Sequence, residues 1–83
     1  METVIVEISV PAINEKIDFR LPSTAKIKDV IAEIARILGT VKGNLQFDPD
    51  TLLLCDLDKG AVLNPSLTVA DQHLQDGATL ELV

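Results

Sequence analysis

The chain has 83 residues and a formal net charge of −6, with 47% hydrophobic residues but only 2% aromatic ones. Its length predicts one domain, residues 1–83, built around a single aliphatic core. The acidic balance repels phosphate backbones, and the scarcity of aromatic rings removes base-stacking platforms, so we expect no nucleic-acid binding. So many aliphatic residues also argue against a disordered chain.

The sequence carries no sign of export or membrane insertion. Cys55 is the single cysteine and cannot form an internal disulfide, and the opening stretch METVIVEISVP lacks the features of a signal peptide. The longest apolar runs fall far short of the roughly 20 residues that a membrane-spanning helix needs. We therefore expect a cytoplasmic protein that does not insert into a membrane, although it can dock onto a membrane protein.

The first part of the chain predicts a β-hairpin. Residues 3–10 (TVIVEISV) alternate with period two, which indicates a strand with one buried face that ends at Pro11. Residues 13–22 (INEKIDFRLP) place apolar side chains on one side of a second strand and charged ones on the other. Asn14 and Glu15 lie near the turn, so the two strands are expected to pair antiparallel.

The period then changes to that of a helix. In residues 25–39 (AKIKDVIAEIARILG) the apolar side chains follow one helical stripe and the charged ones lie off it, which predicts an amphipathic helix. Gly39 stands where a left-handed C-cap residue belongs, so the helix is expected to end there. Its start is open between Ser23 and Thr24 as the N-cap, because neither has Glu or Gln three residues later.

The second half of the chain predicts short strands separated by turns and loops. Short apolar runs bounded by polar turn residues indicate the strands, and the pair Asp76-Gly77 indicates the last turn. In chain order we expect an irregular connection (40–50), a short strand (51–55), a turn (56–60), a very short strand (61–64), a loop with buried Leu67, Val69 and Leu74 (67–77), and a final strand (78–83).

The core is expected between the helix and one face of the sheet. One helix covers only one face, so the elements form a single mixed sheet of four to five strands packed on one main helix. Residues on the inward phase of each element supply the core. They are Val6, Ile17, Phe19, Ile27, Val30, Ile34, Leu54, Leu80 and Leu82.

This order of elements resembles the α+β ubiquitin-like β-grasp fold over nearly the whole chain. The stretches IDFRLPSTAKIKDVIAEIARILG and LTVADQHLQDGATLEL carry the resemblance to the fold. The chain length, the stretches DFRLPSTAKIKDVIAEI and LQDGATLEL, and an end directly after the last strand are similar to the YukD/EsaB family. Members of that family are short ubiquitin-like proteins that accompany bacterial type VII secretion systems.

The resemblance implies a non-enzymatic cytoplasmic accessory or regulatory protein of a type VII (ESX/Ess-like) secretion system. Such a protein acts through protein-protein contacts, and a membrane component of the machinery is a candidate partner. The alternative is a general ubiquitin-like interaction domain of another bacterial pathway. In both cases the sequence ends in Val83 rather than in the exposed Gly-Gly of conjugated modifiers, so conjugation is not expected.

No catalytic, cofactor-binding or metal site is predicted. Cys55 has no basic neighbour in sequence that would lower its thiol pKa, and His73 is the only histidine. The stretch DLDKG, residues 56–60, fails as a calcium loop because its glycine comes one position early and Leu67 replaces the bidentate Glu. We interpret it as an acidic turn.

The predicted interaction site is the sheet face that the helix leaves uncovered. Strict alternation turns one aliphatic residue outward in each of three strands that a β-grasp sheet places side by side. Scattered surface exposure is the alternative, because single exposed aliphatic residues are ordinary. The predicted patch consists of Ile5, Leu53 and Val83, with Glu7, Glu81 and Cys55 at its rim.

A second candidate surface is the acidic half of the chain. Beyond Gly43, Lys59 is the only Lys or Arg residue, and the other charged residues there are acidic. Solubility is the simplest interpretation of this imbalance, and a basic partner is the alternative. Asp56 and Asp58 would lead such a surface.

Overall fold

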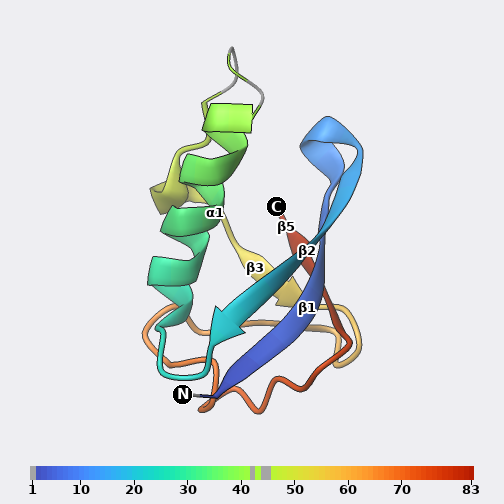
Figure 1. The fold of residues 1–83 in the computed structure, drawn as a ribbon, viewed down its shortest axis with the longest axis vertical. Helices are drawn as coiled ribbons and strands as arrows, with labels where there is room; N and C mark the ends of the chain where they lie inside the picture. Colours follow the sequence, from blue (N-terminus) through green and yellow to red (C-terminus); the bar gives the residue numbers. More distant parts are fainter. Residues whose placement is uncertain (1, 42, 44–45) are drawn as a thin grey trace.

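The computed structural model describes residues 2–41, 43 and 46–83. It consists of one mixed sheet in the order β2-β1-β5-β3-β4, with one helix packed on it (Figure 1). This confirms the predicted α+β class and gives the sheet five strands. The elements are β1 (Thr3–Val10), β2 (Glu15–Pro22), α1 (Ile27–Val41), β3 (Leu54–Asp56), β4 (Ala61–Val62) and β5 (Ala78–Leu82), with 3-10 turns at Pro11–Ile13 and Pro49–Thr51.

The β1–β2 hairpin forms as predicted. The two strands pair antiparallel over their full length, from Thr3 opposite Pro22 to Val10 opposite Glu15. Asn14 adopts a left-handed φ of 53°, a conformation that Asn tolerates better than most residues, and its N–H closes the 3-10 turn on the carbonyl of Pro11.

Strands β1 and β5 pair in parallel and join the two ends of the chain. Ile8 lies opposite Leu80, and both side chains are fully buried beneath α1. The predicted Asp76-Gly77 turn opens β5: Gly77 has a φ of 87° and donates its N–H to the carbonyl of Ile5 at 2.8 Å. Asp76 Oδ1 accepts the N–H of Ile5 at 2.9 Å, so this turn is bound directly to β1.

The core lies between α1 and the sheet, as expected. All of the predicted core residues are buried except Ile17 and Phe19, which are only half-buried. Both belong to β2, which is the edge strand and pairs only with β1, so one side of each side chain has no neighbouring strand. In the loop before β5, Val69 and Leu74 are buried as predicted, whereas Leu67 is 40% exposed.

The first N–H groups of helix α1 donate to main-chain carbonyls that are distant in sequence. The N–H of Ile27 donates to the carbonyl of Leu67 at 2.9 Å, and that of Lys28 donates to the carbonyl of Pro65 at 3.0 Å. No side-chain hydrogen bond from Ser23 or Thr24 is found among the described residues, so neither predicted cap is used. A loop from the second half of the chain satisfies the unpaired N–H groups of the first turn instead.

The predicted end of the helix at Gly39 is wrong. Helix α1 continues through Gly39 to Val41, and Thr40 Oγ1 donates to the carbonyl of Arg36 at 3.0 Å. A glycine acts as a left-handed C-cap where its φ is positive, and Gly39 is not among the glycines with positive φ.

Replacing Ile34, which is 1% exposed at the centre of α1, with Ala should destabilise the protein by about 2–5 kcal/mol. The loss combines the lost burial of the removed methylene and methyl groups with the cavity that they leave. Urea denaturation measures the change. The matched control is Val41→Ala, 68% exposed on the same helix, which should change stability by less than about 0.5 kcal/mol. Equal effects of the two variants would contradict this packing of α1.

Candidate functional site

Leu53 and Val83 are paired directly on the outer face of the sheet, which is the face opposite α1. The N–H of Leu53 donates to the carbonyl of Val83 at 2.7 Å, and the N–H of Val83 donates back at 2.9 Å. These two bonds extend the β3–β5 ladder by one pair beyond Leu54 and Leu82. Side chains directly opposite each other share a face, so the exposed side chains of Leu53 and Val83 lie side by side.

Further apolar side chains continue this surface along β3 and onto β4. Cys55 lies two residues after Leu53 on the same face, and Val62 of β4 lies directly opposite it. Leu57 follows in the same alternation, and its N–H donates to the carbonyl of Thr79 at 2.9 Å. Alternation along LLLCDL, residues 52–57, is enough to predict that Leu57 shares the outer face with Leu53. Placing Val62 beside Cys55 requires the β3–β4 register, which the sequence does not give. The outer patch, as we call it, consists of Leu53, Cys55, Leu57, Val62 and Val83.

Ile5 does not belong to the outer patch, which corrects the predicted cluster. It is exposed on the outer face as expected, but β1 and β5 run parallel, with Ser9 opposite Glu81. That register places Val83 level with Pro11, six positions after Ile5 along β1. At about 3.3 Å per residue the separation along the sheet is roughly 20 Å. The start of β1 and the end of β5 therefore lie at opposite ends of the sheet.

The two predicted acidic rim residues occupy different places on the outer face. Glu81 is half-buried and lies directly opposite Cys55, so it borders the outer patch on the β5 side. Glu7 is exposed on β1 opposite Thr79, one strand further from the patch. Glu81 is therefore the acidic residue adjacent to the outer patch, and Glu7 is more distant from it.

Asp56 is not available to a partner. It is only 2% exposed, and its Oδ1 accepts the N–H of Asp58 at 3.0 Å and that of Lys59 at 3.2 Å. Lys59 Nζ lies 4.0 Å from its other carboxylate oxygen. The carboxylate therefore holds the turn between β3 and β4 in place, and it does not lead an acidic docking surface.

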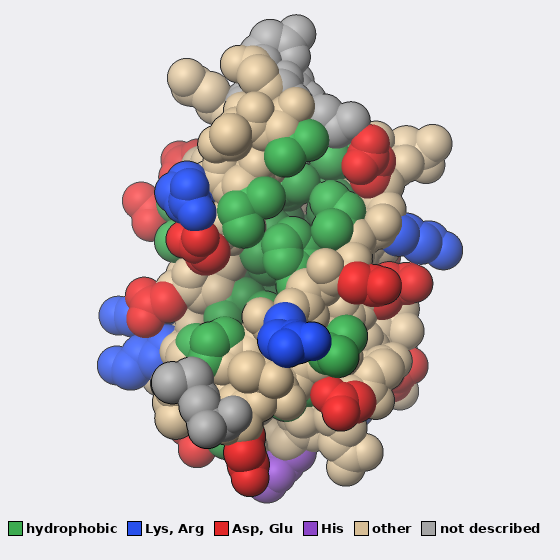
Figure 2. Space-filling model, viewed as in Figure 1, with side chains coloured by type: hydrophobic (Ala, Val, Ile, Leu, Met, Phe, Trp, Pro, Cys, Tyr) green, Lys and Arg blue, Asp and Glu red, His purple; other side chains and the backbone are tan. Residues whose placement is uncertain are grey.

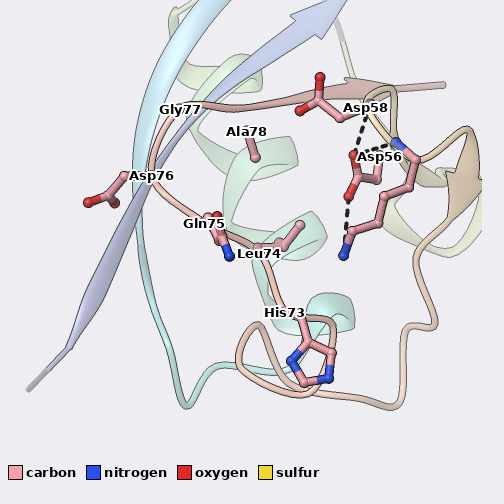
Figure 3. A pocket seen from close by; sticks show the side chains of 9 residues that line it. Asp56, Asp58, His73, Leu74, Gln75, Asp76, Gly77 and Ala78 are labelled. Atoms are coloured by element: carbon pink, nitrogen blue, oxygen red, sulfur yellow. Dashed lines mark hydrogen bonds and ion pairs between the residues drawn. The ribbon is translucent and has the colours of Figure 1, made fainter.

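An open pocket of about 370 Å³ with a mixed polar and apolar lining lies beside this turn (Figure 3). Asp58 enters from the β3–β4 turn, and its Oδ2 accepts the N–H of Thr79 at 3.1 Å. Lys59 Nζ donates to the carbonyl of Gln72 at 3.1 Å, so it ties the turn to the loop before β5. These polar groups are engaged in holding neighbouring segments together, which favours a structural interpretation of the cavity.

His73 lies in the loop before β5 and lines the pocket beside the β3–β4 turn. It is exposed and has a left-handed φ of 56°. One turn earlier, Thr68 and Asp71 bond reciprocally: the Thr68 N–H donates to the Asp71 carboxylate, and the Asp71 N–H donates to Thr68 Oγ1, each at 3.1 Å. The Thr68 N–H, its side chain and the nearby His73 hold the pKa of Asp71 below its ordinary value.

The other shifted pKa values belong to an exposed pair on α1. Hydrogen bonding to Arg36 lowers the pKa of Glu33, and the same contact raises the pKa of Arg36. Among the described residues, no three His, Cys, Asp or Glu side chains gather in an arrangement that could hold a metal ion. No helix in the same part of the chain has the length and apolar character needed to cross a bilayer.

The sheet topology and the similarity to solved structures define the structural class of this protein. The ubiquitin-like domain of EccD5 from Mycobacterium xenopi is 24% identical with a TM-score of 0.78, and the match covers 100% of this chain and 94% of that one. Ubiquitin from Caldiarchaeum subterraneum is 19% identical with a TM-score of 0.72, and the match covers 98% and 91% of the two chains. The protein is therefore a ubiquitin-like β-grasp protein.

The family that matches this sequence is described as "WXG100 protein secretion system (Wss), protein YukD", and the match spans residues 4–82. The chain belongs to the YukD family. It is thus a ubiquitin-like protein associated with type VII secretion, which confirms the family resemblance seen in the sequence. No curated protein matches the chain.

Replacing Asp56 with Ala should destabilise the fold by about 1–3 kcal/mol, because the N–H groups of Asp58 and Lys59 lose their buried acceptor. Thermal unfolding followed by circular dichroism measures the change. The matched control is Asp50→Ala, an exposed acidic residue whose side chain has no hydrogen bond among the described residues, which should have little effect. If Asp56→Ala is as stable as that control, Asp56 does not hold the turn.

Proposed function

We propose that this protein is a cytoplasmic, non-enzymatic component of a type VII secretion system and that it acts by binding a protein of the machinery through its outer patch. The single observation that carries the proposal is the family match over residues 4–82. The outer patch supports the binding role, because it groups exposed aliphatic side chains on the sheet face that α1 leaves uncovered.

The outer patch is suited to binding because its backbone is already ordered. The strands on both sides of Leu53 are held by ladder hydrogen bonds, so docking needs little further ordering of the main chain. Glu81 beside Cys55 favours a partner whose apolar contact surface has a basic residue at its edge. We expect Leu53 and Val83 to be the central apolar contacts and Glu7 to act at longer range.

The non-enzymatic part of the proposal concerns the two residues most capable of chemistry. Cys55 faces outward from β3 opposite Val62, whereas His73 lies in the loop before β5 and lines the pocket beside the β3–β4 turn. The outer patch gives Cys55 a packing role, because a free cysteine commonly behaves as a small hydrophobic residue.

Deleting the gene in the native host should reduce export of WXG100 proteins to the medium, and the wild-type gene should restore it. Quantitative immunoblotting of cells and medium measures export. Export that is unchanged by the deletion would contradict the secretion role and favour the alternative, a ubiquitin-like interaction domain of another pathway.

In the same assay, Leu53→Asp should fail to restore export. A charge at the centre of the outer patch should weaken partner binding by about 1–3 kcal/mol, roughly 5- to 150-fold in Kd, while the exposed position limits the loss of stability. The control is Val41→Asp, which places the same charge on an exposed aliphatic position of α1 and should restore export. Full restoration by a folded Leu53→Asp protein would remove the outer patch from the proposal.

The double variant Cys55→Ser, His73→Asn should restore export as well as the wild type does. Ser keeps the small side chain on β3, and Asn tolerates the left-handed backbone at position 73. Thermal unfolding of the purified variant checks its folding beforehand. A folded double variant that leaves export abolished would overturn the non-enzymatic assignment.

A further inference from the structure

A second surface, separate from the outer patch, lies between helix α1 and edge strand β2. It is an open groove of about 370 Å³ whose lining is mostly apolar. Figure 2 shows hydrophobic side chains gathered between α1 and the β1–β2 hairpin, with charged side chains around them. The residues that form the groove are Phe19, Leu21, Pro22, Ala25, Val30, Ile34 and Ile37, with Arg20, Asp29 and Glu33 at its edges.

The groove has a buried floor and half-exposed walls. Leu21 and Ile34 are almost completely buried and form the floor. Phe19 on β2 and Ile37 on α1 are half-exposed and face the groove from opposite sides. Phe19 is one of only two phenylalanines in the chain, and a partly exposed aromatic ring beside an apolar floor is a frequent anchor of binding energy.

Strand β2 also has an unpaired edge along this groove. The N–H of Ser23 donates to the carbonyl of Glu2 at 3.0 Å, so Ser23 and every second residue before it direct their main-chain groups toward β1. The intervening residues Lys16, Asp18 and Arg20 therefore direct their N–H and C=O groups away from β1. Because β2 ends the sheet in the part of the chain that the structure describes, these groups have no neighbouring strand there.

We propose that the groove binds an extended segment of a protein partner, which adds to β2 as a sixth strand. The unpaired edge supplies main-chain hydrogen bonds, and the groove takes every second side chain of the segment against Phe19 and Ile37. Aliphatic side chains fit these positions, because the floor is apolar and shallow. The geometry thus calls for a segment in which aliphatic residues alternate with others.

The acidic residues on the α1 side of the groove favour a basic residue in the bound segment. Asp29 and Glu33 are exposed on the α1 side of the groove, and Arg20 is exposed on its β2 side, so the acidic charge is confined to the helix side. Glu33 is paired with Arg36, whereas the Asp29 carboxylate has no ion pair or hydrogen bond among the described residues. A Lys or Arg in the bound segment, next to its aliphatic side chains, would meet Asp29.

The same charges disfavour a second copy of this chain as the occupant. Two copies paired edge to edge through β2 would bring both α1 helices to the same gap, so the acidic helix side of one groove, with the uncompensated Asp29, would face that of the other. The net charge of −6 adds to this repulsion. A partner segment with a basic residue has no such penalty.

A phage-displayed library of random linear peptides of about ten residues, long enough to pair along all of β2, tests the proposal on the full chain. Selected peptides should alternate aliphatic residues with others and contain Lys or Arg. Binding of a synthetic selected peptide should slow exchange of the amide protons of Lys16, Asp18 and Arg20. A library that yields no binder, or binders that dock as helices, would overturn the proposal.

Two pairs of variants locate the binding in the groove. Ile37→Lys should weaken peptide binding about tenfold or more in calorimetry, whereas Val41→Lys, on the same helix outside the groove, should change it by less than about twofold. Leu53→Asp on the outer patch should also leave affinity unchanged, which separates this site from the one in the proposed function. Equal affinities for the Ile37 and Val41 variants would contradict a groove site.

The backbone contribution has its own test. Asp18→Pro removes an N–H that faces the free edge and leaves the β1–β2 bonds intact, so it should weaken the peptide about tenfold, whereas Asp18→Ala should not. If the proline variant fails to fold, N-methylation of alternate peptide amides removes the same bonds from the other side. Unchanged affinity in either experiment, or a concentration-dependent dimer that the peptide does not displace, would rule out strand addition.

Discussion

The parallel pairing of β1 with β5 is the constraint on which the rest of this structure depends. It brings the two ends of the chain together, so its ladder bonds and the burial of Ile8 and Leu80 offset the entropy of closing almost the whole chain into one loop. Every other strand is attached through these two: β2 through β1, and β3 with β4 through β5. Helix α1 then covers the inner face that this pairing creates.

The polar groups inside this arrangement are satisfied by distant main-chain and side-chain partners. Asp56 is buried yet accepts two N–H groups of its own turn, and the first turn of α1 donates to carbonyls near Leu67. Among the described residues, no buried side-chain nitrogen or oxygen atom lacks a partner. The acidic residues of the second half therefore serve the fold as well as solubility, and Asp56 in particular connects β3 to β4.

The two proposed surfaces lie at opposite edges of the sheet and on opposite faces. The outer patch is built on β3, β4 and the end of β5, whereas the groove is built on β2 and α1. The two surfaces are therefore built on different strands of the sheet.

The sequence by itself determined the types of elements and most of the core. Alternation marked β1 and the helical stripe marked α1, because both periods follow from local backbone geometry. Only the structure decided how far α1 runs, since a glycine can be helical or left-handed and Gly39 is helical here. It also decided which exposed residues lie together: alternation turns Ile5 and Val83 outward, but the parallel register, a pairing between distant segments, separates them.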